Sequence, residues 1–107
     1  MQKKGKQFQQ LKTLRVMVKT RVWVLTALFT ADNKESRVEV VGVYNHLDKA
    51  VETMWFHHEN IKEAWVKDGI KEDDMLNIRT KWVCVLKINN RYKQVELGIY
   101  GEDIDND

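Results

Sequence analysis

Two early stretches of the chain, 21–30 and 37–44, are mainly apolar and rich in valine, threonine and aromatic residues. The polar cluster 32–36 (DNKES) separates them. Two runs of such residues, separated by a polar turn, predict an antiparallel hairpin. A second hairpin is predicted from residues 78–88 (IRTKWVCVLKI) and 91–100 (RYKQVELGIY), which meet at Asn89 and Asn90. Asparagine tolerates the positive φ of a tight turn.

Between the two hairpins the apolar residues recur with the period of a helix. Asn45 is expected to cap this helix, with Asp48 three positions later completing a pair like a capping box. The helix should run to about Lys67 and end at Gly69, which can adopt the left-handed conformation. Residues 70–77 (IKEDDMLN) are expected to be a polar connector with room for one helical turn. The predicted fold is therefore α+β: a single ββαββ domain whose four-stranded antiparallel sheet carries one main helix on one face.

Two of the predicted strands are apolar on both faces. The first alternates between Val22, Val24 and Leu28 on one face and Trp23, Leu25, Ala27 and Phe29 on the other. The third does the same, with Val83 and Val85 opposed to Trp82, Cys84, Leu86 and Ile88. One helix can cover only one face of a sheet. The other face must be covered by the N-terminal segment, by a second copy or by a partner, and we expect a homodimer.

Residues 1–20 fit two conformations. Phe8, Leu11 and Leu14 recur at near-helical spacing, whereas positions 14–24 alternate as in a strand. A single strand over 14–30 would extend about 55 Å at about 3.3 Å per residue. Such a strand would be longer than a domain of this size, whose radius of gyration is about 13 Å. Either the chain breaks near 19–21 or the overhang pairs with another molecule, and Met17 is an alternative start for the protein.

The formal net charge of +2 conceals an asymmetry between the two ends. The last seven residues carry four acids and no base, whereas residues 1–21 carry no acid. We therefore divide the chain into a basic N-terminal arm or extension (1–20), a ββαββ domain (21–101) and an acidic tail (102–107). Such separation is typical of solvated termini or of an arm that binds nucleic acid or a partner. The basic residues of the N-terminal region are Lys3, Lys4, Lys6, Lys12, Arg15, Lys19 and Arg21.

The composition, with 43% hydrophobic and 32% charged residues, is that of a soluble globular protein. The longest apolar run, 22–29, is too short to span a membrane. A lone cysteine, Cys84, excludes an intrachain disulfide, and no secretion signal is recognised at the start. We expect a cytoplasmic protein that does not enter a membrane.

The helix places its histidines on different faces. On a 100° helical wheel His58 falls within an apolar stripe, His57 about 80° to one side, and Phe56 among acidic residues on the opposite face. A zinc-protease site needs two histidines four residues apart on one face of a helix, and this helix has no pair with that spacing. We therefore expect no metal, and we expect His58 to be a core histidine bonded to backbone. The stripe consists of Leu47, Ala50, Val51, Met54, Ile61 and Trp65.

No catalytic motif is recognisable. The five glycines are scattered, Ser36 is the only serine, and no histidine is placed to activate Cys84. The acidic residues at 68 and 72–74 lack the spacing of a calcium loop. We expect no enzymatic activity and no cofactor.

Two functions from different classes remain. The first is binding to another protein through exposed aromatic and apolar residues, which are enriched in interface cores. Its candidate residues are Trp55, Phe56, Val66, Trp23 and Trp82. The alternative is nucleic-acid binding through the seven basic residues above, with aromatic rings stacking on unpaired bases.

The stretch 40–52 (VVGVYNHLDKAVE) resembles small accessory proteins of phages and other mobile elements. The resemblance lies in a strand that ends in Gly42-Val43-Tyr44, then a turn, then a helix with Lys49-Ala50 in its first turn. It implies an accessory factor that binds and modulates or inhibits a host or defence protein. It assigns no functional residue.

Overall fold

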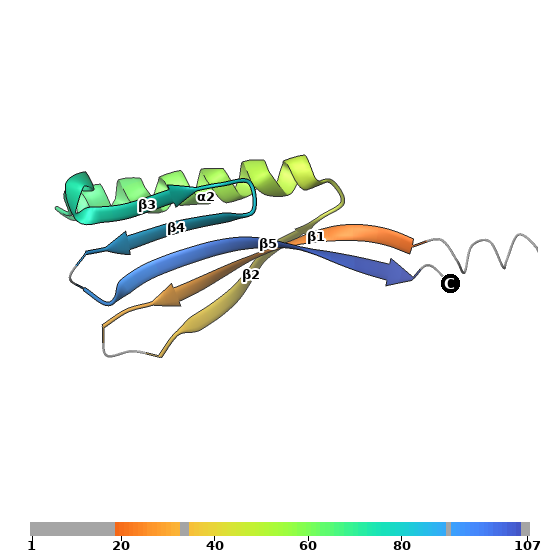
Figure 1. The fold of residues 1–107 in the computed structure, drawn as a ribbon, viewed down its shortest axis with the longest axis horizontal. Helices are drawn as coiled ribbons and strands as arrows, with labels where there is room; N and C mark the ends of the chain where they lie inside the picture. Colours follow the sequence, from red (N-terminus) through yellow and green to blue (C-terminus); the bar gives the residue numbers. More distant parts are fainter. Residues whose placement is uncertain (1–18, 33–34, 90, 106–107) are drawn as a thin grey trace, which may run out of the picture.

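The computed structural model describes residues 19–32, 35–89 and 91–105 (Figure 1). Five strands form one antiparallel sheet in the order β2-β1-β5-β4-β3, and the helix α2 lies along one side of it (Figure 1). Five arm residues, Lys3, Lys4, Lys6, Lys12 and Arg15, lie outside the described residues. The elements are β1 (Lys19–Thr30), β2 (Arg37–Tyr44), α2 (Leu47–Lys67), the 3₁₀ turn η1 (Glu72–Asp74), β3 (Met75–Arg79), β4 (Val83–Ile88) and β5 (Lys93–Asp105).

The α+β class and the single domain are confirmed, but the prediction of four strands in the order ββαββ is wrong. The described order is ββαβββ, because the stretch 78–88 is divided between two strands, β3 and β4. Thr80 makes the turn between them: its N–H donates to the Val83 carbonyl at 2.9 Å, and its hydroxyl oxygen accepts from the Val83 N–H at 2.9 Å. β3 begins inside the segment that was expected to be a connector, directly after η1.

The helix has nearly the predicted bounds. It ends before Gly69, whose φ of +95° is the left-handed conformation that glycine adopts freely. The Ile70 N–H donates to the Trp65 carbonyl at 3.0 Å and closes the helix end. The predicted cap is wrong: the residue at the N-cap is His46, not Asn45, and it makes no side-chain capping bond.

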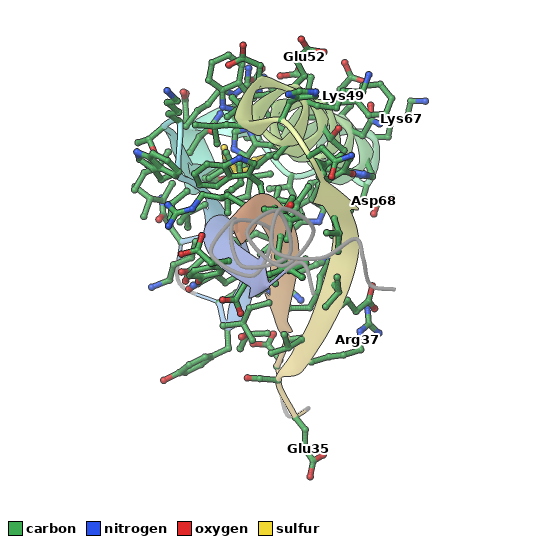
Figure 2. The ribbon with its side chains drawn as sticks, turned by 90° about the vertical axis from the view of Figure 1, so that its right-hand side faces the viewer. Glu35, Arg37, Lys49, Glu52, Lys67 and Asp68 are labelled. Carbon is green, nitrogen blue, oxygen red and sulfur yellow. The ribbon has the colours of Figure 1, made fainter. Side chains whose placement is uncertain are left out.

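The core lies between α2 and one face of the sheet. Leu25, Leu86 and Leu97 from three neighbouring strands are almost completely buried there, and Met54 meets them from the helix. Lys49 and Glu52 project from the opposite side of the helix, away from the sheet (Figure 2). The apolar stripe that was predicted for the helix thus faces the sheet, as the buried Ala50, Val51, Met54 and Trp65 show.

β1 and β5 form a long ribbon that continues past the N-terminal end of α2 (Figure 1). They pair from Lys19 opposite Asp105 to Thr30 opposite Gln94, so this part of the expected overhang is paired within the chain. β5 includes residues 102–105 of the predicted acidic tail. Arg21 binds Asp103 across the ribbon, with Nε to Oδ1 at 2.8 Å. The division of the chain into arm, domain and tail otherwise stays a prediction.

Candidate interaction surfaces

Three tryptophans from separate elements gather at the turn between β3 and β4. The ring of Trp23 on β1 lies 5.9 Å from that of Trp82 in the turn, measured between centroids, with the planes tilted by 45°. Trp55 on α2 donates its indole N–H to the Thr80 carbonyl at 2.9 Å. The turn therefore anchors both sides of one surface, made of Trp23, Trp55, Trp82 and Lys81, which we call the tryptophan surface.

The indole rings of this surface are flanked by cations. The Lys81 ammonium lies 5.7 Å from the Trp82 centroid, and the Arg21 guanidinium carbon lies 5.6 Å from the Trp23 centroid. Such contacts contribute about 0.5–1 kcal/mol each at exposed sites. A hydrogen bond from its side chain to Asp103 raises the pKa of Arg21. The rings are thus held in place while remaining accessible, with Trp82 46% and Trp55 39% exposed.

A depression lies beside the tryptophan surface, between the first turns of α2 and the β3–β4 turn. Its volume is about 340 Å³. It is lined by Asp48, Val51, Glu52, Trp55 and Lys81. Its lining therefore combines charged groups of both signs with two apolar side chains.

Phe56 and Val66, the other two predicted protein-binding residues, lie apart from this surface. Phe56 is 63% exposed and its ring makes an edge contact with His57, at 5.9 Å between centroids. The prediction that Phe56 points away from the sheet is consistent with this exposure. Val66 is exposed near the far end of α2. The structure thus brings together Trp23, Trp55 and Trp82 and separates Phe56 and Val66 from them.

His58 is buried, as the sequence predicts, and the partner of its Nδ1 is a side chain where a backbone group was expected. Its Nδ1 accepts from Arg79, with the Nη2 and Nε atoms at 3.0 and 3.2 Å. Arg79 also binds Glu59 at 3.0 Å and lies over the Trp55 ring at 5.9 Å. Burial, followed by the charge of Arg79, lowers the pKa of His58, so the ring is neutral at pH 7.

The second nitrogen of His58, Nε2, makes no hydrogen bond of good geometry within the described part of the chain. The Val85 backbone nonetheless lies close enough to favour the protonated ring, which partly opposes the effects of burial and Arg79. The proton of the neutral ring is assigned to Nε2, because Nδ1 accepts from a guanidinium, which has donors but no acceptor.

Cys84 and Asp32 are both engaged by neighbouring groups of the described chain. Cys84 is fully buried and its Sγ lies 3.8 Å from the Thr80 carbonyl, while burial raises the pKa of the thiol. Asp32 lines a depression of about 460 Å³, but its carboxylate is occupied by the Tyr92 N–H at 2.7 Å and Arg91 Nε at 3.3 Å. No group of three or more His, Cys, Asp or Glu side chains that could hold a metal occurs in the described ranges.

The face of the sheet opposite α2 is a second apolar surface. Val24 and Leu28 on β1 and Val83 and Val85 on β4 lie outside the core cluster. Val40 on the outer strand β2 is 63% exposed. The sequence predicts one sheet face that the helix cannot cover, and among the described residues this is that face.

Sequence analysis did not assign a role to Arg79, Lys81 or Thr80. Their spacing carries no motif, and their positions depend on the turn that separates β3 from β4. Of the seven basic residues proposed for nucleic-acid binding, Arg21 is the one whose side chain is described, and Asp103 accepts from it.

Neither protein-family models nor curated proteins nor solved structures give a match to this chain. Within residues 19–32, 35–89 and 91–105, no helix combines the length and hydropathy that a membrane span requires.

Proposed function

We propose that this chain is a non-catalytic protein that binds another protein through the tryptophan surface. The observation that carries the proposal is the convergence of Trp23, Trp55 and Trp82 from three elements onto one turn, with their rings half-buried or exposed. Tryptophan and arginine are the residues most enriched among those that dominate interface energies. Rings that are already held in place lose little conformational freedom on binding.

The chemistry of the surface suggests what the partner offers. Arg21 and Arg79 are each neutralised by a carboxylate of this chain, whereas Lys81 has an indole ring as its neighbour. The partner therefore needs an apolar or aromatic centre that packs on the indoles, with at most a few carboxylates for Lys81. The resemblance at residues 40–52 adds a finer proposal: the partner is a host or defence protein that the chain modulates or inhibits.

Nucleic-acid binding is the second candidate, and the contacts of Lys81 with Trp82 and Arg21 with Trp23 favour it. Alternating cations and aromatic rings are also how proteins hold unpaired nucleotides, by stacking and by phosphate contacts. The carboxylates of Asp103 and Glu59 stand against it, because they occupy the two guanidinium groups that phosphates would need. We therefore favour a protein partner.

Quantitative capture from a lysate tests the proposal. The full chain is immobilised as wild type, as Trp82→Ala and as Phe56→Ala, and bound proteins are quantified by mass spectrometry after nuclease treatment. We expect a protein that wild type and Phe56→Ala retain and that Trp82→Ala loses. Phe56→Ala is the matched control, since it removes an exposed aromatic ring outside the tryptophan surface.

Two results would oppose the proposal. The first is equal capture of every bound protein by wild type and Trp82→Ala. The second is nuclease-sensitive capture together with direct binding of a labelled 20-nucleotide oligo(dT) that weakens steeply with salt, which would support the second candidate.

A further inference from the structure

We propose that a second copy of this chain packs on the face of the sheet that α2 leaves uncovered, and that the protein is a homodimer. We call this surface the open face. It lies on the side of the sheet opposite the tryptophan surface, so the inference does not depend on the proposed function.

The strand register sets the composition of the open face. β2 carries a bulge opposite Leu25 and Thr26, and this extra residue brings both Val40 and Val43 to the same face. The rows that cross the strands are Val38–Leu28–Glu96–Val85–Ile78, Val40–Thr26–Gly98–Val83, Val43–Val24–Tyr100 and Thr30–Gln94–Lys87–Leu76.

Most of these side chains are apolar, and several are exposed on strands far apart in the sheet. Val40 on β2 is 63% exposed, Tyr100 on β5 57% and Ile78 on β3 39%. The Tyr100 ring lies over Gly98, its hydroxyl 3.1 Å from where a Cβ of that glycine would be, and so fills the centre of the face. Monomers rarely expose a continuous apolar patch larger than a few hundred Å².

The size of the open face matches what a dimer needs. Five strands about 4.8 Å apart give a width of about 24 Å, and the rows extend about 20 Å along the strands, a footprint of about 500 Å². Two such faces in contact bury about 1,000 Å² if they are treated as flat, without the extra area of the protruding side chains. This area reaches the lower limit for a specific interface. We therefore expect an association in the micromolar range.

A second sheet fits the face better than other occupants. Two sheets pack face to face about 10 Å apart with their strands nearly aligned, so a copy covers all five strands at once. A helix about 10 Å wide covers only about two strands. Charge also permits self-association: the rows contain one acid, Glu96, and one base, Lys87, so two copies meet as nearly neutral surfaces.

Light scattering after size exclusion, on the full chain loaded between about 5 and 200 µM, measures the association expected of such an interface. The mass should rise with concentration towards twice 12.7 kDa. Val40→Glu and Ile78→Glu place a carboxylate near opposite edges of the open face. Each is expected to weaken dimerisation at least about tenfold, since the charge would be buried without a partner. Phe56 is as exposed as Val40 but lies outside the open face, so Phe56→Glu should leave the dimer intact.

Each alternative gives a different result. A wild-type protein that stays at 12.7 kDa up to 200 µM overturns the proposal. Loss of the dimer in Val40→Glu but not in Ile78→Glu indicates pairing along the edge of β2, and loss in Phe56→Glu indicates the helix; both overturn it. Circular dichroism melts verify folding, and Tyr100→Glu replaces Ile78→Glu if that variant is unfolded.

Discussion

Removing the guanidinium of Arg79 should destabilise the protein far more than removing an exposed arginine in an equivalent ion pair. Arg79→Met retains most of the hydrocarbon chain but leaves Nδ1 of the buried His58 without a donor. A buried acceptor without a partner costs about 1–3 kcal/mol. The exposed ion pair with Glu59 adds at most about 1 kcal/mol.

Arg37→Met is the matched control. Arg37 forms an ion pair with Glu39 at 2.8 Å and lies over the Phe29 ring at 4.8 Å, just as Arg79 pairs with Glu59 and lies over Trp55. Both of its partners are on the sheet, and no buried histidine depends on it. Arg37 also lies near the start of β2, well away from α2 (Figure 2). We expect Arg37→Met to change the free energy of unfolding by less than about 1 kcal/mol.

Urea unfolding at pH 7.5, followed by tryptophan fluorescence, measures both variants. With a slope of about 1–3 kcal/mol per molar urea, the extra loss in Arg79→Met corresponds to a midpoint lower by about 1 M. If the two variants lose equal stability within about 0.5 kcal/mol, the hydrogen bond from Arg79 to His58 is not what holds this part of the structure, and the reasoning fails.

Three further predictions rest on other described features. Because the pKa of His58 is lowered in the folded protein, the unfolded chain binds more protons than the folded one below about pH 6.5. The free energy of unfolding should therefore decrease from that pH down to the folded pKa, by at most about 1.4 kcal/mol per pH unit. Urea titrations between pH 7.5 and 5 should show a weaker decrease in His58→Leu. The buried Cys84 thiol, with its raised pKa, should react with a disulfide reagent at pH 8 far more slowly in native protein than in urea, and equal rates would contradict its burial. Gly69→Ala should lower the free energy of unfolding by about 1 kcal/mol or more, because Gly69 has a φ of +95°. The space around an added Cβ is open, so the cost comes from the backbone conformation alone. An unchanged urea midpoint would be inconsistent with that conformation.

Much of α2 could be predicted because its period depends on neighbouring residues alone. The helical wheel identified the stripe that faces the sheet, the burial of His58 and the exposure of Phe56. The predicted cap at Asn45 failed because the chain enters the helix one residue later, at His46, without a side-chain cap.

The strand β3 was missed because its turn contains no glycine, proline or asparagine. Thr80 supplies the turn through its hydroxyl, and threonine is also an ordinary strand residue. This error hid the partner of His58, since Arg79 reaches the helix only once β3 folds back beside β4. It also hid the tryptophan surface, in which Trp55 and Trp82 meet the same turn.

The two-faced pattern of β1 predicted a second apolar face that the helix cannot cover, but the composition of that face depends on long-range register. Tyr100 lies beside Val24 only because β5 pairs with β1 along its full length. That pairing joins residues between 64 positions apart (Thr30 and Gln94) and 86 positions apart (Lys19 and Asp105), and no local pattern specifies it.

Measuring the affinity of the captured partner for wild type, Trp82→Ala and Phe56→Ala, at about 50 and 200 mM salt, tests the proposed function most directly. Trp82→Ala should weaken binding at least about tenfold, or about 1.4 kcal/mol, while Phe56→Ala and the change in salt alter it only slightly. An affinity that is insensitive to Trp82 and falls about a thousandfold with salt would contradict the proposal and assign the binding to charge alone.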